Sequence, residues 1–160
     1  LLENIRAARP RASRDEVLAA AHAAQCDDIL EKLPQGLDTV VGTKGVYLSG
    51  GEQQRIALAR AILKNAPIVV LDEATAFADP ENEHQIQKAF EALTRNKTVL
   101  MIAHRLSTVQ DADNIIVLSD GKIAEQGNHR DLLQKNGVYA AMWADYQRSA
   151  QWKVGKEAAV

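Results

Sequence analysis

Three stretches of the chain carry apolar residues at i, i+3 and i+4 spacing, which is typical of helices with one buried face. A capping-box pattern, Ser13 with Glu16 three residues later, predicts that the first helix begins near Arg14. A second helix is predicted from Gly50 to about Asn65, with Ser49 at or near its N-cap, and a third follows Pro80. The predicted buried faces are Val17, Ala20, Ala21 and Ala24; Ile56, Ala59 and Leu63; and Ile86, Ala89, Phe90 and Leu93.

Unbroken aliphatic runs alternate with these helices. "IVVLDE" (68–73), "TVLMIAH" (98–104) and "NIIVLS" (114–119) predict strands that are buried on both faces, as in parallel sheets. "SDGK" (119–122) is a hairpin signal after the last of them, and "DDILEKLPQG" (27–36) predicts one or two helical turns. A final helix is predicted from about Arg130, with residues 151–160 as a frayed tail. This alternation indicates an α/β fold with a layered core.

Composition narrows the class of protein. The 160 residues are 46% hydrophobic and 25% charged, with a formal net charge of -2 and charges spread along the chain, so nucleic acid is not an expected partner. The single cysteine, Cys26, lies among alanines and is expected to be a small buried side chain in a reducing compartment. No apolar run approaches the roughly 18 residues that a membrane-spanning helix needs.

Polar side chains stand where two of the predicted strands end. Asp72 and Glu73 close the first run, and His104 closes the second. Ligand-contacting groups gather at the carboxyl ends of parallel strands, so these three residues are expected to face one crevice. One carboxylate can hold a hard cation such as Mg²⁺, the other can orient or deprotonate a water, and an imidazole can donate to a phosphoryl oxygen. Taken singly, each motif is equally compatible with a helix cap or a buried histidine.

Taken in order, the motifs have a family likeness. The chain resembles the nucleotide-binding domain of ATP-binding-cassette (ABC) proteins, and closely resembles that of exporter-type ABC transporters. "LSGGEQQR" (48–55) looks like the ABC signature, "IVVLDE" like the Walker B strand with its following glutamate, "ATAFAD" (74–79) like the D-loop, and "IAHRLST" (102–108) like the switch-histidine loop. The likeness covers residues from about Glu3 to Tyr146. It implies a P-loop NTPase (RecA-like) core with parallel strands, plus an α-helical signature subdomain.

The resemblance also implies roles, with ATP and Mg²⁺ as cofactors. Asp72 would help to hold Mg²⁺ through its water shell, Glu73 would polarise the attacking water, and His104 would contact the γ-phosphate. Asp79 would act across a dimer interface. The signature would close over ATP held by the opposite protomer, and its predicted binding residues are Ser49, Gly50, Gly51, Glu52 and Gln53. Glycines and a helix start suit that task, because they offer backbone donors and positive potential.

Two departures from the family pattern stand out. Family D-loops usually read Ser-Ala-Leu-Asp, whereas residues 76–79 read Ala-Phe-Ala-Asp. No G-x-x-x-x-G-K-[ST] phosphate loop occurs in the chain. We therefore expect the C-terminal half of a nucleotide-binding domain from a longer polypeptide, with weak or no ATP binding in isolation. The predicted divisions are an α-helical subdomain at 1–52, the second half of the catalytic core at 53–148 and a tail at 149–160.

As part of a transporter, this domain would couple ATP hydrolysis to transport of an unknown substrate. Its expected partners are a second nucleotide-binding domain, in a homodimer or heterodimer, and a transmembrane domain that would hold it at the cytoplasmic face of the membrane. One alternative keeps the family but changes the role: an ABC ATPase that acts in DNA maintenance or is linked to translation. A second alternative is a dimerisation or regulatory module that does not catalyse ATP hydrolysis. Arg55 and Arg60 lie in the signature helix. Their side chains either pack within the domain or carry charge at an interface between domains, and the sequence is compatible with both.

Overall fold

A computed structural model describes residues 1–43, 45–72, 80–103 and 106–157. The chain divides into two compact units, Leu1–Ile102 and Ala103–Val160. The units are described separately. No helix within the described ranges is long and apolar enough to cross a membrane.

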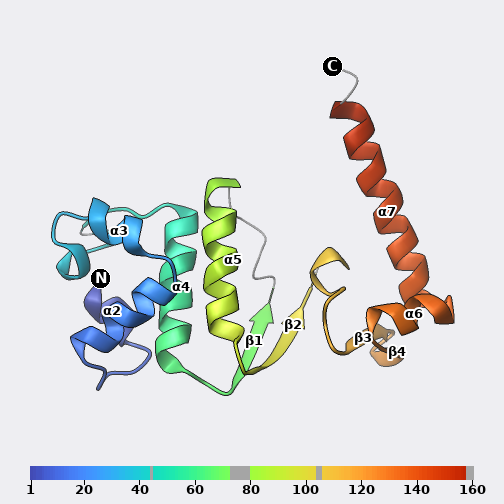
Figure 1. The fold of residues 1–160 in the computed structure, drawn as a ribbon, viewed down its shortest axis with the longest axis horizontal. Coiled ribbons are helices and arrows are strands. Elements are labelled where there is room, and N and C mark those ends of the chain that lie inside the picture. The colour runs from blue at the N-terminus through green and yellow to red at the C-terminus, as the bar shows by residue number, and fades with distance from the viewer. Residues whose placement is uncertain (44, 73–79, 104–105, 158–160) are drawn as a thin grey trace. The chain divides into compact units, whose positions relative to one another are not determined.

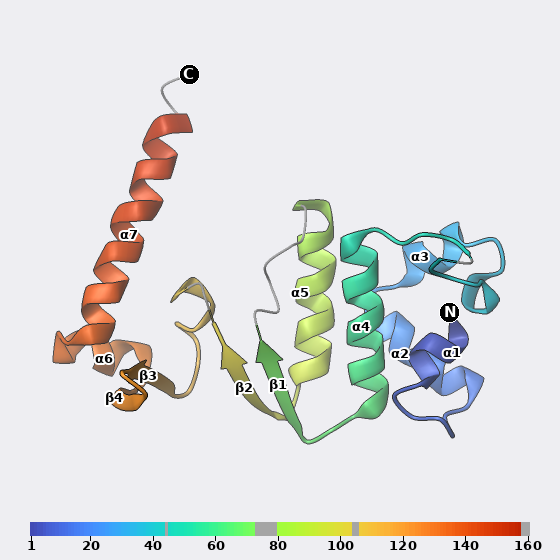
Figure 2. The same cartoon turned by 180° about the vertical axis from the view of Figure 1, so that it is seen from behind.

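The first unit is built from helices that lie on one side of a short parallel sheet (Figure 1). In chain order its elements are α1 (Leu2–Arg6), α2 (Arg14–Ala23), α3 (Asp27–Lys32), the 3-10 turn η1 (Gly36–Asp38), α4 (Gly50–Lys64), β1 (Ile68–Asp72), α5 (Pro80–Thr94) and β2 (Thr98–Ile102). Strands β1 and β2 pair in parallel, with Asp72 level with Ile102. Both strands run toward the end of the unit at which α4 and α5 begin (Figures 1 and 2).

The predicted helical faces form the core of this unit. Val17, Ala21 and Ala24 are fully buried, together with Ala59 of α4 and Ala89 of α5. One cluster joins these residues to Ile5, Cys26, Ile29, Ile56, Leu63, Leu71, Ile86 and Leu93. Cys26 is buried as predicted, and burial raises the pKa of its thiol to about 12, which keeps it protonated and unreactive.

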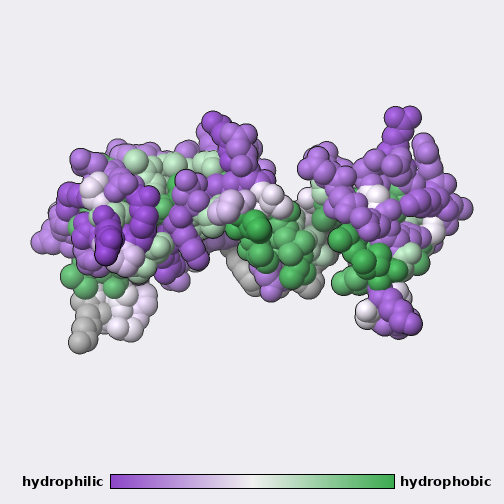
Figure 3. Space-filling model, turned by 90° about the horizontal axis from the view of Figure 1, so that it is seen from below, coloured by the Kyte–Doolittle hydropathy of each residue, from purple (hydrophilic) through white to green (hydrophobic). Residues whose placement is uncertain are grey.

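The expectation that the strands are buried on both faces is wrong for the sheet of this unit. Val69 and Leu71 of β1 pack against the core, but the alternate residues Ile68 and Val70 are 62% and 61% exposed. Leu100 and Ile102 of β2 are also more than half exposed. Successive side chains in a strand point to opposite faces, so one face meets α5 and the other is uncovered in the described structure. Figure 3 shows that face as an apolar patch.

The second unit pairs a hairpin with two helices. It contains the 3-10 turn η2 (Leu106–Thr108), the antiparallel strands β3 (Ile115–Ser119) and β4 (Lys122–Gly127), α6 (His129–Lys135) and α7 (Val138–Glu157). The predicted hairpin turn is confirmed: Asp120 and Gly121 both have positive φ, as a tight hairpin turn requires. Ile115, Val117, Leu132 and Tyr139 are buried against one another.

The single helix predicted from about Arg130 is two helices. Asn136 adopts the left-handed conformation that ends α6, and α7 begins after Gly137. Helix α7 then continues to Glu157, through most of the stretch predicted to be a frayed tail. On α7, Tyr139 is 1% exposed and its ring stacks on Trp143, whereas Met142 is 46% exposed.

Candidate phosphate-facing site at the signature helix

The signature residues form the start of α4. Ser49 is the N-cap: its hydroxyl accepts the Glu52 N–H at 3.3 Å, and the Glu52 carboxylate accepts the Ser49 N–H at 2.7 Å. The Gln53 N–H donates to the Ser49 carbonyl at 2.9 Å, and its side-chain amide donates to the Leu48 carbonyl. This reciprocal capping box is the local reason why the helix begins here.

Two backbone donors remain at the helix start. The capping box occupies the Glu52 N–H, but neither the Gly50 nor the Gly51 N–H has a hydrogen-bond partner among the residues that the structure describes. Ser49 and Gly50 are exposed, whereas Gly51 is buried. Unpaired N–H groups at the positive end of a 15-residue helix make a local site for an anion.

Gly50 has no packing role within the chain. A Cβ placed on it would meet nothing within 4 Å of the described structure, and its φ is not positive. Glycine in a helix costs up to about 1 kcal/mol relative to alanine, so neither space nor backbone conformation in this chain explains the choice. Close approach of an external group to the backbone is one physical reason for a glycine at such a position.

The Glu52 carboxylate bonds to other residues of the chain. Its side chain is 10% exposed; one oxygen accepts the Ser49 N–H and the other accepts from the Lys32 ammonium at 2.9 Å. Burial acts to raise the pKa of the Glu52 carboxyl, but the Ser49 N–H and Lys32 more than offset it and hold that pKa below its ordinary value. A carboxylate with both oxygens engaged holds the cap in place and is not directed at a ligand.

The other predicted site residues lie at or beyond strand ends. Asp72 is the last residue of β1, is exposed and lies in register with Ile102. Glu73, Asp79 and His104 lie outside the described residues. Helix α5 lies between α4 and β1 in both ribbon views, so Asp72 and the signature occupy different positions along this end of the unit (Figures 1 and 2).

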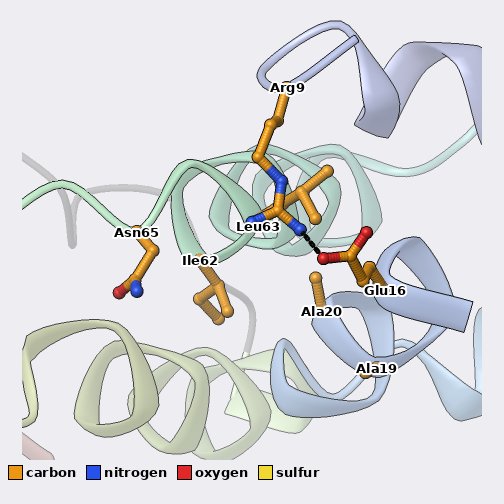
Figure 4. A pocket seen from close by; sticks show the side chains of 7 residues that line it. All are labelled: Arg9, Glu16, Ala19, Ala20, Ile62, Leu63 and Asn65. Atoms are coloured by element: carbon orange, nitrogen blue, oxygen red, sulfur yellow. Dashed lines mark hydrogen bonds and ion pairs between the residues drawn. The ribbon is translucent and has the colours of Figure 1, made fainter. Parts of the chain in front are cut away.

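A shallow pocket of about 350 Å³ lies at the other end of α4. It is lined by Arg9, Glu16, Ala19, Ala20, Ile62, Leu63 and Asn65, and Arg9 pairs with Glu16 at its edge (Figure 4). A helix of this length separates Asn65 from Ser49 by about 20 Å, so the pocket is not part of the signature site.

Similarity to known proteins agrees with the motifs. The family model described as "ABC transporter" matches residues 2–76. The chain is 51% identical over 138 residues to the ATP-dependent lipid A-core flippase of Haemophilus influenzae (strain 86-028NP), a match that covers 86% of this chain and 24% of the flippase. The chain is thus similar to proteins of the ABC transporter family. Its likeness to the ATPase domain of exporter-type members, and with it the P-loop NTPase fold class, is thereby confirmed.

Two further similar proteins are an ABC transporter and an ABC exporter of known structure. The chain is 51% identical over 149 residues to the ABC transporter ATM1 of Toxoplasma gondii, which covers 92% of this chain and 13% of that protein. Its fold matches the structure of a bacterial Atm1-family ABC exporter with ATP bound, at a TM-score of 0.76 and 51% identity, over 89% of this chain and 25% of that one. The chain thus spans about a quarter of the length of the lipid A-core flippases that it matches.

Sequence reasoning missed the partners of Arg55. Its side chain is 2% exposed and donates to both carboxylate oxygens of Asp28, at 2.7 and 2.8 Å, and to the Gln25 carbonyl at 2.5 Å. The Arg55 hydrogen bonds are the main reason why the pKa of the Asp28 carboxyl lies below its ordinary value. These partners lie 27 and 30 positions from Arg55, so no local pattern in the sequence points to them.

Proposed function

We propose that this chain supplies the signature surface and the hydrolytic carboxylate of the ATP site of an ABC transporter, which couples ATP hydrolysis in a dimer to transport of an unidentified substrate. The observation that carries the proposal is the pair of unpaired N–H groups of Gly50 and Gly51, beside the exposed Ser49. They face the γ-phosphate of an ATP held by a second nucleotide-binding domain. Glu52 and Gln53 contribute by holding this helix start in shape.

The hydrolytic residues follow the strands. Asp72 fits a role toward Mg²⁺, because proteins hold this ion through one or two carboxylates while substrate phosphates complete its shell. The ion would supply charge neutralisation at the β- and γ-phosphates. Glu73 accepts a proton from, or orients, the attacking water, and His104 donates to a γ-phosphate oxygen. Asp79 acts across the interface between the two domains.

The setting of this ATPase is a membrane transporter. The relatives are named as a lipid A-core flippase, an ABC transporter and an ABC exporter, which supports a membrane setting. The partners that we propose are a second nucleotide-binding domain and a transmembrane domain, and the proposed location is the cytoplasmic face of a membrane. The substrate is left unnamed, because the described residues include none that would select it.

The isolated 160-residue chain is expected to bind ATP weakly or not at all. Its sequence has no G-x-x-x-x-G-K-[ST] loop, so it lacks the nest of backbone donors and the lysine that grip the β- and γ-phosphates in P-loop proteins. Calorimetric titration of the chain with ATP and Mg²⁺ should give no detectable heat up to about millimolar ligand, which corresponds to less than about 4 kcal/mol of binding free energy. Micromolar binding would mean that another phosphate site exists in these residues.

Function itself is best tested in a chimera. In this flippase chimera, the chain replaces the matching segment of the Haemophilus influenzae lipid A-core flippase, and Mg²⁺-dependent ATP hydrolysis is measured. Substituting Gly50→Ala should lower hydrolysis about tenfold or more, because a Cβ would stand where the phosphate approaches. In the isolated chain the same change should leave the unfolding free energy equal or raise it by up to about 1 kcal/mol.

The two measurements separate the proposal from a packing role for Gly50. Loss of hydrolysis without loss of stability supports a ligand-facing glycine. A chimera that hydrolyses ATP equally well with Gly50→Ala would contradict the proposed contact, and an unmutated chimera that binds ATP but does not hydrolyse it would favour a non-catalytic module.

A further inference from the structure

Two ion pairs join α3 to the first turns of the signature helix. Asp28 pairs with Arg55 and, four residues later on α3, Lys32 pairs with Glu52. Both helices carry the acidic residue before the basic one, but the partners follow in opposite order, since Glu52 precedes Arg55 on α4. Each negative group therefore meets a positive one in one relative position of the two helices. Sliding α3 by about a turn would bring Asp28 toward Glu52, or Lys32 toward Arg55, and like charges would meet. The pairs therefore set the register between α3 and α4.

Arg55 also fixes the bend before α3. Besides Asp28, its guanidinium reaches the carbonyl of Gln25, a residue with φ +57° between α2 and α3. A buried guanidinium is held by the groups that surround it, and here a carboxylate and a backbone carbonyl are both supplied by the α2–α3 segment. The position of α4 is thus tied to that segment through one side chain.

The same connections lead to the phosphate-facing donors. The second oxygen of Glu52 accepts the Ser49 N–H, so Lys32, Glu52 and the N-cap form a continuous polar chain. Arg55 lies about one turn beyond Gly51 on a continuous helix. Because a short helix moves as a rigid rod, a shift at Arg55 displaces the Gly50 and Gly51 N–H groups by a comparable amount.

We propose that Asp28 is a positioning residue for ATP hydrolysis: through Arg55, and together with the Lys32–Glu52 pair, it holds the start of α4 where its unpaired N–H groups meet the γ-phosphate. The inference rests on the proposed function, since it concerns the same helix start. Misplacement of catalytic groups by about 1 Å can cost two orders of magnitude in rate, so the effect is measurable although Asp28 touches no ligand.

Asp28→Asn in the flippase chimera tests this. The Asp28 side chain is 62% exposed, so the change removes a charge without opening the core. The signature meets ATP when the two domains close, after ATP has bound, so kcat should fall about tenfold while KM changes less than about threefold. Asp28→Glu, which restores a carboxylate, should recover at least half of the lost rate.

The chain offers a matched control. Arg14 and Asp38 form a pair with the same two-bond geometry, at 2.7 Å for both bonds, on exposed side chains that do not contact α4 through any interaction seen in the described residues. Asp38→Asn is expected to leave kcat within twofold. Equal losses of kcat for the two variants, in proportion to equal losses in melting temperature, would overturn the positioning role.

Hydrogen exchange of the isolated chain tests whether Asp28 holds the start of α4 in place, and it does so without measuring ATP hydrolysis. Asp28→Asn should speed exchange of the Ser49 and Glu52 amides, which the capping box protects, by about tenfold, and Asp38→Asn should not. Unchanged exchange at these amides would overturn the inference even if the chimera were inactive. If Gly50→Ala abolishes hydrolysis but Asp28→Asn changes neither kcat nor exchange, the inference fails and the proposed function stands.

Discussion

Replacing Glu73 by Gln in the flippase chimera is expected to lower the rate of ATP hydrolysis by roughly 10²- to 10⁴-fold, the contribution typical of a positioned general base. The side chains have nearly the same shape, but the amide cannot accept a proton from water. Glu73 directly follows Asp72, the last residue of β1, where the parallel pairing with β2 brings two strand ends to one edge. Ligands bind at that edge of parallel sheets, which is why a catalytic role is expected of Glu73.

ATP binding should survive this change. Nucleotide affinity, measured by calorimetry on the chimera, is expected to stay within about threefold, because the phosphate grip and the Mg²⁺ ligand are untouched. Glu91→Gln makes the same chemical change on an exposed position of α5 and should leave the rate within twofold. A Glu73→Gln chimera that keeps more than a third of the rate would mean that another group activates the water.

The elements that the sequence predicted best are those with local causes. Helices α2 and α4 begin at residues Arg14 and Gly50 because Ser13 and Ser49 each form a capping box with a glutamate three residues later, and both partners are visible in a short window. The Asp120–Gly121 turn is equally local. The start of the signature helix could be located from sequence for the same reason.

Other features depend on partners that are distant in sequence. The break between α6 and α7 had a local signal, because asparagine and then glycine commonly end helices, and the prediction of one helix from about Arg130 passed over it. The exposed face of β1 had no local signal in the sequence. A run of aliphatic residues predicts a strand buried on both faces, but tertiary packing decides what covers each face. The bond between Arg55 and Asp28 likewise joins elements whose approach no local pattern encodes.

The start of α7 is capped by a strand, and this gives the last prediction. Its N-cap residue, Gly137, has no side chain to offer; instead the Glu125 carboxylate of β4 accepts the Val138 N–H at 2.7 Å and the Tyr139 N–H at 2.9 Å. A Cβ on Gly137 would lie 1.7 Å from one of those carboxylate oxygens and 2.9 Å from its carbon. An alanine at this position would force the Glu125 carboxylate to move away from the helix start, where it accepts these two hydrogen bonds.

Gly137→Ala is expected to lower the free energy of unfolding of the second unit by about 1–3 kcal/mol, the cost of losing hydrogen bonds to a charged group. Urea denaturation followed by tryptophan fluorescence measures it, since Trp143 packs on Tyr139 in this unit. Gly50→Ala is the matched control, because it adds the same methyl at a helix start into open space and should cost nothing.

A double-mutant cycle assigns the cause. Glu125→Ala removes the cap directly and should lower the free energy of unfolding by a similar amount. The double variant, Glu125→Ala with Gly137→Ala, should have a free energy of unfolding within about 0.5 kcal/mol of that of the less stable single variant. The methyl group has nothing left to displace once the carboxylate is gone. If the two costs add in full, Gly137 contributes through its own backbone freedom, and the carboxylate of Glu125 is not what makes glycine necessary at this position.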